Sequence, residues 1–294
     1  MSAAVFAFDD DKAPARRLAD ELGVPLHPVH LHRFPDGESL PSVVSGLATA
    51  ILYRDLSNPD CKLFTLLLAA DALRRAGAAR LVLAAPYLPY LRQDRLFAPG
   101  QSLSRDVLGA QLGPPFDRIV TVAPHLHRTA DLTAVFAGTP VSVLSAARLF
   151  AHSLAGGPPP VVVGPDAESY GWATAAAAEL GADALVLRKT RSGDAAVRLS
   201  LPPGAAVVGR RVVLVDDICA SGATLATAAE ALRALGAGSV QALVVHALFD
   251  AAAAGRLRQA GIGRIVSTDS CAHPSNRINL AGLLADALRE DLTA

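Results

Sequence analysis

Cysteine is scarce in this sequence of 294 residues, and its few copies are widely scattered. The three cysteines, Cys61, Cys219 and Cys271, have none of the spacings that are typical of a zinc site or a disulfide framework. This scarcity argues against the small disulfide-stabilised secreted folds and favours a reduced, cytoplasmic setting.

Long hydrophobic runs and an excess of charge of either sign are also missing. No apolar stretch approaches the roughly 18 residues needed to span a bilayer. Acidic residues interrupt the N-terminal segment, which lacks the basic region of a signal peptide. The 27 basic and 27 acidic residues cancel to a formal net charge of zero. We therefore expect neither a membrane nor a nucleic acid as a partner.

Lysine is rare as well. Only Lys12, Lys62 and Lys189 occur among the 27 basic residues, and the rest are arginine. A compact ammonium group binds differently from a planar guanidinium group, so a lysine in this chain is informative. Lys189 opens a polar, glycine-containing segment, 189–194, for which an ordinary exposed loop is the alternative interpretation.

Hydrophobic residues are abundant, at 51 % of the chain, which is enough for a sizeable core. The length fits one large or two ordinary domains. Helix and strand patterns alternate along the chain, which predicts an α/β fold with mainly parallel sheets. The expected helices are 14–22, 62–76, 104–112, 169–180 and 225–235. The expected strands are 26–32, 80–85, 118–123, 161–163, 184–187, 211–215 and 240–248.

The two halves of the sequence resemble each other faintly. A helix that ends in Glu-Leu-Gly before a strand occurs at Gly23 and again at Gly181, 158 residues later. A second helix-glycine-strand junction occurs at Gly77 and at Gly236, 159 residues later. Two nearly equal offsets indicate two copies of one domain, joined near residues 140–158.

The segment 212–224 contains the strongest candidate site. The apolar strand is followed by Asp216 and Asp217, then by a loop of small residues, and then by a helix. Small residues let backbone N–H groups close around a phosphate, and the helix directs its positive end toward the anion. Paired carboxylates can accept hydrogen bonds from two neighbouring hydroxyls. The pattern predicts a site for a phosphorylated ribose, with an ordinary βα turn capped by acids as the alternative. The loop residues are Cys219, Ala220, Ser221, Gly222, Ala223 and Thr224.

The segment Asp216–Thr224 resembles the phosphoribosyl-pyrophosphate binding motif of type I phosphoribosyltransferases and of ribose-phosphate pyrophosphokinase. Four other segments resemble the second family in the right order, so that the match covers essentially the whole chain. These segments are Arg33–Glu38, Pro86–Arg95, the pyrophosphate loop Val162–Asp166 and the C-terminal tail Thr268–Arg289.

This resemblance implies two tandem type I phosphoribosyltransferase-like domains, each a mainly parallel sheet flanked by helices. The first, 1–145, would carry the ATP-side motifs, and the second, 146–294, the ribose 5-phosphate loop and the catalytic loop. The last helix could pack back on the first domain. The implied reaction is the transfer of the pyrophosphoryl group of ATP to the 1-hydroxyl of ribose 5-phosphate, giving phosphoribosyl pyrophosphate and AMP. A homo-oligomer, a dimer or a hexamer, is implied because the family shares its ATP site between subunits.

The ATP-binding residues that the resemblance implies come from two segments. Phe34, Asp36 and Glu38 lie at a Pro-Asp-Gly turn, which is also typical of a plain hairpin tip. An aromatic face can stack on adenine, and a carboxylate can accept a hydrogen bond from its amino group. Arginines at the end of a strand can clamp a triphosphate, although a solvated charge cluster is the alternative. The second group consists of Arg92, Gln93, Asp94 and Arg95.

The resemblance also implies a Mg²⁺ cofactor and a catalytic loop. His125, His127 and Asp166 are the candidate metal contacts, although the chain reads Ala-Pro-His-Leu-His where most relatives read Asp-Leu-His-Ala. Mg²⁺ prefers oxygen ligands, so it would depend on carboxylates and phosphates. Lys189 and Arg191 would close over the transferring group.

The repeat offset carries two further predictions. It places 192–196 on 34–38, so one hairpin would serve catalysis and its copy ATP binding. It places 216–224 on 58–66, which lacks both acids, so the first copy would not bind ribose phosphate. Two alternatives stay open: a phosphoribosyltransferase that consumes phosphoribosyl pyrophosphate, and a non-catalytic regulatory homologue, favoured by the departures around His125 and Ala220.

Overall fold

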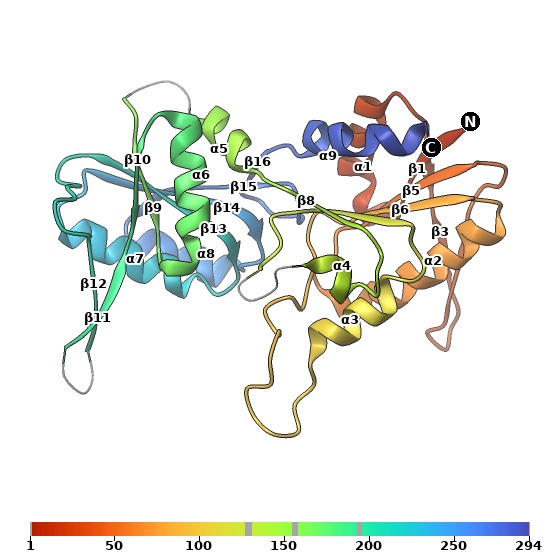
Figure 1. Cartoon of the computed structure of the whole chain (residues 1–294), viewed down its shortest axis with the longest axis horizontal. Coiled ribbons are helices and arrows are strands. Elements are labelled where there is room, and N and C mark those ends of the chain that lie inside the picture. The colour runs from red at the N-terminus through yellow and green to blue at the C-terminus, as the bar shows by residue number, and fades with distance from the viewer. Residues whose placement is uncertain (1, 127–130, 155–157, 193–195, 294) are drawn as a thin grey trace. The chain divides into compact units, whose positions relative to one another are not determined.

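The computed structural model describes residues 2–126, 131–154, 158–192 and 196–293, without the side chains of residues 189–198. The chain divides into two compact units. Unit 1 comprises Met1–Leu144 and Leu280–Ala294, and unit 2 comprises Ser145–Asn279. Each unit is built around its own six-stranded parallel sheet (Figure 1).

The sheet of unit 1 has the strand order β2-β1-β5-β6-β7-β8, and every neighbouring pair is parallel. Its strands are nearly continuous apolar runs, as expected of a parallel sheet covered on both faces. The strands are β1 Ala3–Ala7, β2 Leu26–Pro28, β5 Thr49–Tyr53, β6 Arg80–Ala84, β7 Arg118–Val122 and β8 Val141–Leu144. The helices are α1 Lys12–Leu22, α2 Leu63–Arg75, α3 Ser104–Leu112, α4 Leu132–Val135 and α9 Ala281–Leu288, with short 3-10 turns η1 Asp9–Asp11, η2 Pro59–Cys61 and η4 Arg289–Leu292.

The C-terminal segment belongs to unit 1. Helix α9 packs on α1, and both lie on the side of the sheet opposite α2 and α3 (Figure 1). The buried carboxylate of Asp291 accepts hydrogen bonds from Arg118 Nη1 at 2.7 Å and from Arg80 Nε at 2.8 Å. These arginines begin strands β7 and β6, so the end of the chain is anchored to the sheet of the first unit.

Unit 2 repeats this architecture. Its parallel sheet has the order β10-β9-β13-β14-β15-β16, which matches unit 1 strand for strand. The strands are β9 Val161–Gly164, β10 Asp183–Val186, β13 Arg211–Cys219, β14 Ser239–Ala247, β15 Ile262–Thr268 and β16 Asn276–Ile278. The helices are α5 Ala147–Leu154, α6 Tyr170–Leu180, α7 Ala223–Ala234 and α8 Ala251–Gln259, with the 3-10 turn η3 Ala167–Ser169. The α/β class and its two parallel-sheet units are confirmed.

Each unit also has an antiparallel hairpin outside its main sheet. In unit 1 the hairpin consists of β3 His30–Arg33 and β4 Ser39–Ser42, and in unit 2 of β11 Arg188–Ser192 and β12 Ala196–Ser200. Corresponding strands start 157 or 158 residues apart. The equivalence of the two hairpins that the sequence offset predicted is therefore confirmed at the level of the backbone.

Two predicted strand boundaries are wrong. The expected strand 26–32 is broken at Val29, because β2 pairs with β1 in the main sheet whereas β3 pairs with β4. Strand β13 continues four residues beyond the expected 211–215, because its partner β14 extends to Ala247 and pairs with Cys219. Within the described part of the chain, no helix has both the length and the apolar character needed to cross a membrane.

Candidate functional site

Asp216 and Asp217 lie inside strand β13 rather than after it. Asp216 stands opposite Val244 of β14, and the strand runs on to Cys219. Backbone N–H groups donate to the two carboxylates within the strand, since Asp216 Oδ1 accepts from Asp217 N at 3.1 Å and Asp217 Oδ1 from Ile218 N at 2.7 Å. Both acids are half-buried at the carboxyl end of the sheet, where open α/β sheets bind ligands.

The carboxyl group of Asp216 lies in an unfavourable electrostatic environment. Burial raises its pKa to about 8, and the nearby charges of Asp217 and Asp166 add to this effect. Asp166 lies in the expected pyrophosphate loop, so the fold brings two separately predicted segments together. Strongly shifted carboxylates that face like charges are typical of functional sites, because a bound cation or hydroxyl donor relieves the repulsion.

Asp166 fixes the start of the helix that follows it. Its Oδ1 accepts hydrogen bonds from Glu168 N at 3.1 Å, Ser169 N at 3.3 Å and Ser169 Oγ at 3.0 Å. This cap holds the 3-10 turn η3 at the N-terminal end of α6. Gly164 is needed just before it, since a Cβ at this position would lie 2.9 Å from the Cβ of Ser169.

The loop from Ala220 to Gly222 turns strand β13 into helix α7. Gly222 has φ +74°, and a Cβ there would lie 3.1 Å from the side chain of Leu257, so only glycine fits without strain. The Cys219 thiol is buried, and its pKa is raised to about 12 by burial and by the charge of Asp216. Cys219 therefore stays protonated and is not a nucleophile.

The predicted catalytic residues lie on the hairpin of unit 2. The backbones of Lys189 and Arg191 belong to β11 and pair with Leu199 and Val197 of β12. Their side chains are outside the described part of the chain. Their roles therefore stay predictions that rest on the family motif.

The predicted ATP residues of the hairpin in unit 1 lie in a tight turn. Phe34 N donates to Glu38 O and Gly37 N donates to Phe34 O, both at 2.9 Å, while Asp36 Oδ1 accepts from Glu38 N at 3.1 Å. The Phe34 ring is 40 % exposed and stands edge-on to His32, with the ring centroids 4.5 Å apart. A half-exposed aromatic ring held in this way is available for stacking.

The second predicted ATP segment, Arg92–Arg95, forms an irregular loop after β6. Arg92, Gln93 and Arg95 are exposed, and Asp94 is half-buried. The Arg95 guanidinium lies 5.0 Å from the ring centroid of the exposed Phe97. The arginines thus have the exposure that a phosphate clamp needs.

Tyr90 precedes this loop, and no role was predicted for it from the sequence. Its backbone has φ 63°, which is uncommon outside glycine, and its hydroxyl donates to Asp60. The hydrogen bond to Asp60 also raises the pKa of the Tyr90 phenol. Tyr90 further lines a cavity of about 520 Å³ whose other walls come mainly from apolar side chains of α2 and α3.

Only some of the expected metal contacts lie in the described part of the chain. His125 follows β7 and is half-buried, whereas His127 lies outside the described residues. Among the described side chains, no three His, Cys, Asp or Glu residues gather closely enough to hold a metal ion. A Mg²⁺ ion would therefore need phosphate oxygens of the substrates in addition to protein carboxylates, which is its common mode of binding.

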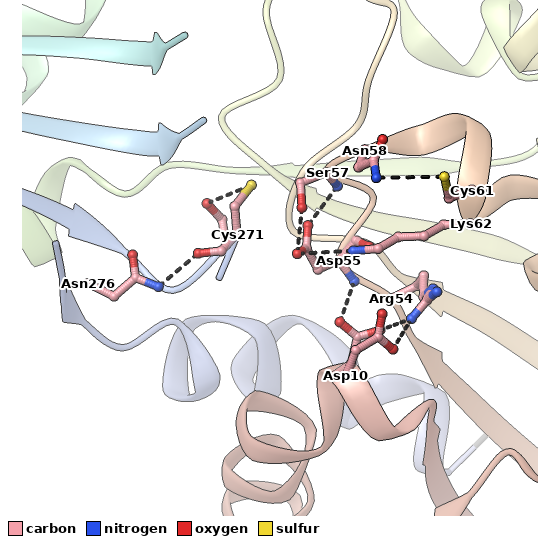
Figure 2. A network of polar contacts seen from close by, with 11 residues as sticks. Asp10, Arg54, Asp55, Ser57, Asn58, Cys61, Lys62, Cys271 and Asn276 are labelled. Atoms are coloured by element: carbon pink, nitrogen blue, oxygen red, sulfur yellow. Dashed lines mark hydrogen bonds and ion pairs between the residues drawn. The ribbon is translucent and has the colours of Figure 1, made fainter. Parts of the chain in front are cut away.

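At the equivalent strand end of unit 1, an ion-pair network replaces the paired acids (Figure 2). Arg54 follows β5 and donates from Nη1 to Asp10 at 2.5 Å and to Asp11 at 2.6 Å. Its guanidinium also lies 4.2 Å above the ring centroid of Phe8. Burial raises the pKa of Asp11 to about 6, although Arg54 partly offsets the rise.

Asp55 and Lys62 complete this network (Figure 2). Asp55 accepts from Ser57 N at 2.7 Å and Ser57 Oγ at 2.8 Å, and Lys62 Nζ donates to the Asp55 carbonyl at 2.8 Å. The fixed sequence offset is wrong here. The strand pair Tyr53–Ala84 in unit 1 is equivalent to the pair Val215–Leu243 in unit 2. Arg54 and Asp55, rather than residues 58 and 59, are therefore the equivalents of Asp216 and Asp217. The connection from β12 to β13 is four residues longer than that from β4 to β5, so the offset has already grown before β5 begins.

Comparisons with known proteins agree with this architecture. Residues 142–269 match the family model of the phosphoribosyl transferase domain. Residues 3–112 match the N-terminal domain of ribose phosphate pyrophosphokinase. The fold and the paired acids of β13 thus define a phosphoribosyltransferase-type α/β protein.

Relatives that match over nearly their whole length identify the family within this class. The chain is 35 % identical to ribose-phosphate pyrophosphokinase from Methanopyrus kandleri, over 97 % of this chain and 98 % of that protein. It is 34 % identical to ribose-phosphate pyrophosphokinase 2 from Archaeoglobus fulgidus, over 92 % and 95 % of the two chains. The crystal structure of phosphoribosylpyrophosphate synthetase from Mycobacterium smegmatis matches with a TM-score of 0.85 and 26 % identity, covering 100 % of this chain and 99 % of that one. The chain belongs to the ribose-phosphate pyrophosphokinase family, whose members are transferases.

Proposed function

We propose that this chain transfers the pyrophosphoryl group of ATP to the 1-hydroxyl of ribose 5-phosphate, with Mg²⁺ as cofactor. The observation that carries the proposal is the strand end of unit 2. There Asp216 is half-buried, and the charges of Asp217 and Asp166 add to the rise in its pKa. Such a site is suited to hydroxyl donors and a cation.

The ribose 5-phosphate would bind at the end of β13. Asp216 and Asp217 would accept hydrogen bonds from the ribose hydroxyls. The 5-phosphate would bind at the N-terminus of α7, near Gly222, Ala223 and Thr224, where the first N–H groups have no intrahelical acceptor. The equivalent end of β5 carries the Arg54 and Lys62 ion pairs, so we infer one such site in each chain.

Mg²⁺ fits the donor set of this site. Asp166 and Asp216 would offer carboxylate oxygens, and a bound divalent cation would reduce their mutual repulsion. The ion would supply charge neutralisation on the phosphate oxygens. ATP would contact Arg92 and Gln93, with Phe34, Asp36 and Glu38 contributed by a second copy in a homo-oligomer.

The chemistry needs no covalent intermediate. The 1-hydroxyl attacks the β-phosphorus, AMP leaves, and positioning and charge neutralisation provide most of the rate enhancement. Lys189 and Arg191 would stabilise the charge that develops on the transferring group. A reduced, cytoplasmic setting suits both the substrates and the protonated thiol of Cys219.

The test is an AMP-release assay. The purified chain is incubated with ATP, ribose 5-phosphate and Mg²⁺, and AMP and phosphoribosyl pyrophosphate are quantified. We expect stoichiometric formation of the two products that stops when ribose 5-phosphate or Mg²⁺ is left out. If ribose 5-phosphate binds but no AMP forms, the proposal fails in favour of a non-catalytic homologue. Base-dependent release of pyrophosphate from phosphoribosyl pyrophosphate would favour a phosphoribosyltransferase.

A further inference from the structure

Helix α8 supports the phosphate loop of unit 2 from behind. Arg256 donates from Nη2 to the carbonyl oxygen of Ser221 at 3.0 Å. The next residue, Leu257, is fully buried and packs against the Cα of Gly222, where an added Cβ would lie 3.1–3.2 Å from its side chain. Two consecutive residues of one helix thus contact two consecutive residues of the loop.

The peptide between Ser221 and Gly222 is held by two neighbouring residues of α8. The C=O of Ser221 accepts a hydrogen bond from Arg256, and the Cα of Gly222 packs against Leu257. The entry into α7 is therefore fixed by contacts with one helix.

The geometry points to Arg256 as a positioning residue for the 5-phosphate of ribose 5-phosphate, an inference that rests on the proposed function. By fixing the Ser221 carbonyl, the guanidinium orients the first N–H groups of α7 toward the anion. A charged donor to a backbone carbonyl is among the stronger single hydrogen bonds. Helix α3 connects β6 and β7 of unit 1, which are equivalent to the strands β14 and β15 that α8 connects. The sixth residue of α3 is Gly109, whereas the sixth residue of α8 is Arg256.

Arg258 provides a matched control. It lies on the same exposed turn of α8, and its side chain forms no hydrogen bond within the described part of the chain. Arg256→Gln and Arg258→Gln remove the same charge from the same helix. We expect Arg256→Gln to raise the Kd and the KM for ribose 5-phosphate about fivefold, which corresponds to about 1 kcal/mol. The kcat and the KM for ATP should stay within about twofold of the wild type, and so should every constant of Arg258→Gln.

The measurements are steady-state kinetics with each substrate varied, and isothermal titration calorimetry with ribose 5-phosphate in the absence of ATP. Equal effects of the two substitutions would overturn the inference, because charge alone would then explain them. A loss of kcat without a change in KM would overturn it too. If the wild type does not bind ribose 5-phosphate, the proposed function is wrong. If the wild type binds it and Arg256→Gln has the same Kd, only the role of Arg256 is wrong.

Discussion

The ends of β5 and β13 occupy the same place in two equivalent sheets, but their charged side chains are arranged differently. At the end of β5, Arg54 lies between Asp10 and Asp11, and Lys62 binds Asp55. At the end of β13, Asp216 faces Asp217 and Asp166. One strand end pairs its acids with basic side chains, and the other brings acids close to one another. A repeated fold can therefore keep its frame while the two copies carry different charge arrangements at the same strand end.

The two hairpins extend this comparison. The β3–β4 hairpin places an exposed aromatic ring, Phe34, at its tip, and the β11–β12 hairpin contains Lys189 and Arg191. Lys62 and Lys189 are two of the three lysines in the chain. One is bound within the ion-pair network, and the other lies on the predicted catalytic loop. The comparison predicts stability effects from unit 1 and activity effects from unit 2.

The largest effect is expected at Arg54. Arg54→Met removes the cation between two acids, of which Asp11 is buried, and should destabilise unit 1 by about 3–5 kcal/mol. Urea unfolding followed by circular dichroism measures this change. Arg75→Met, which breaks the exposed pair with Asp71, is the control and should change unfolding little. If both variants unfold alike, the network does not stabilise the first unit.

Replacement of Lys189 should separate activity from stability. Lys189→Ala should lower kcat by about 10²–10³-fold while leaving ribose 5-phosphate binding and the Tm nearly unchanged. Lys62→Ala should do the reverse, with nearly unchanged kcat and a loss of about 1–3 kcal/mol in stability, because Asp55 loses its cation. AMP release and thermal unfolding are measured on both proteins. A normal kcat in Lys189→Ala would remove its assigned role.

Replacement of Asp216 should weaken substrate binding and increase the stability of the fold. Asp216→Asn should lower kcat/KM for ribose 5-phosphate about 10–100-fold, because a carboxylate acceptor for the ribose hydroxyls, which bound Mg²⁺ would keep ionised, is replaced by a neutral amide. It should also raise the Tm above pH 4, since a carboxyl whose folded pKa is raised costs stability once its unfolded form ionises. Asp55→Asn is the counterpart in unit 1 and should leave kcat/KM unchanged. A fall in kcat/KM of similar size in Asp55→Asn would contradict the comparison.

The smallest expected effect is the pH dependence of Asp11. Its pKa of about 6 in the folded chain exceeds the ordinary value of 3.8, so the unfolded state binds fewer protons between these values. Stability from this group is present below pH 4 and is lost as pH rises through about 6. Between pH 5 and 7 the wild type should lose about 1 kcal/mol more stability than Asp11→Asn. Parallel pH profiles in chemical denaturation would show that Asp11 titrates normally.

Much of this fold could be predicted from the sequence because periodic patterns are local. The helix at 104–112 and the strand at 80–85 follow from hydrophobic spacing and glycine ends, and the structure places them within a residue. The equivalence of the hairpins followed from the repeat offset. The extension of β13 to Cys219 was missed because a strand's length depends on its partner, and β14 runs equally far.

The site was predictable where a motif is continuous and not where it depends on distant contacts. Asp216, Asp217 and Gly222 stand in one segment that sequence alone marks as a phosphate site. The contact of Arg256 with Ser221 joins residues 35 positions apart, and that of Arg54 with Asp11 joins residues 43 apart. Charged residues after β5 were a visible signal, but the longer connection between β12 and β13 shifted them out of the repeat offset.

We infer that each chain has one ribose 5-phosphate site and that it lies at the end of β13. Isothermal titration calorimetry of ribose 5-phosphate into the wild type, Asp216→Asn and Asp55→Asn measures the number of sites and their location. We expect a stoichiometry of one per chain, retained in Asp55→Asn and abolished or greatly weakened in Asp216→Asn. Two sites per chain, or a loss of binding in Asp55→Asn alone, would contradict it.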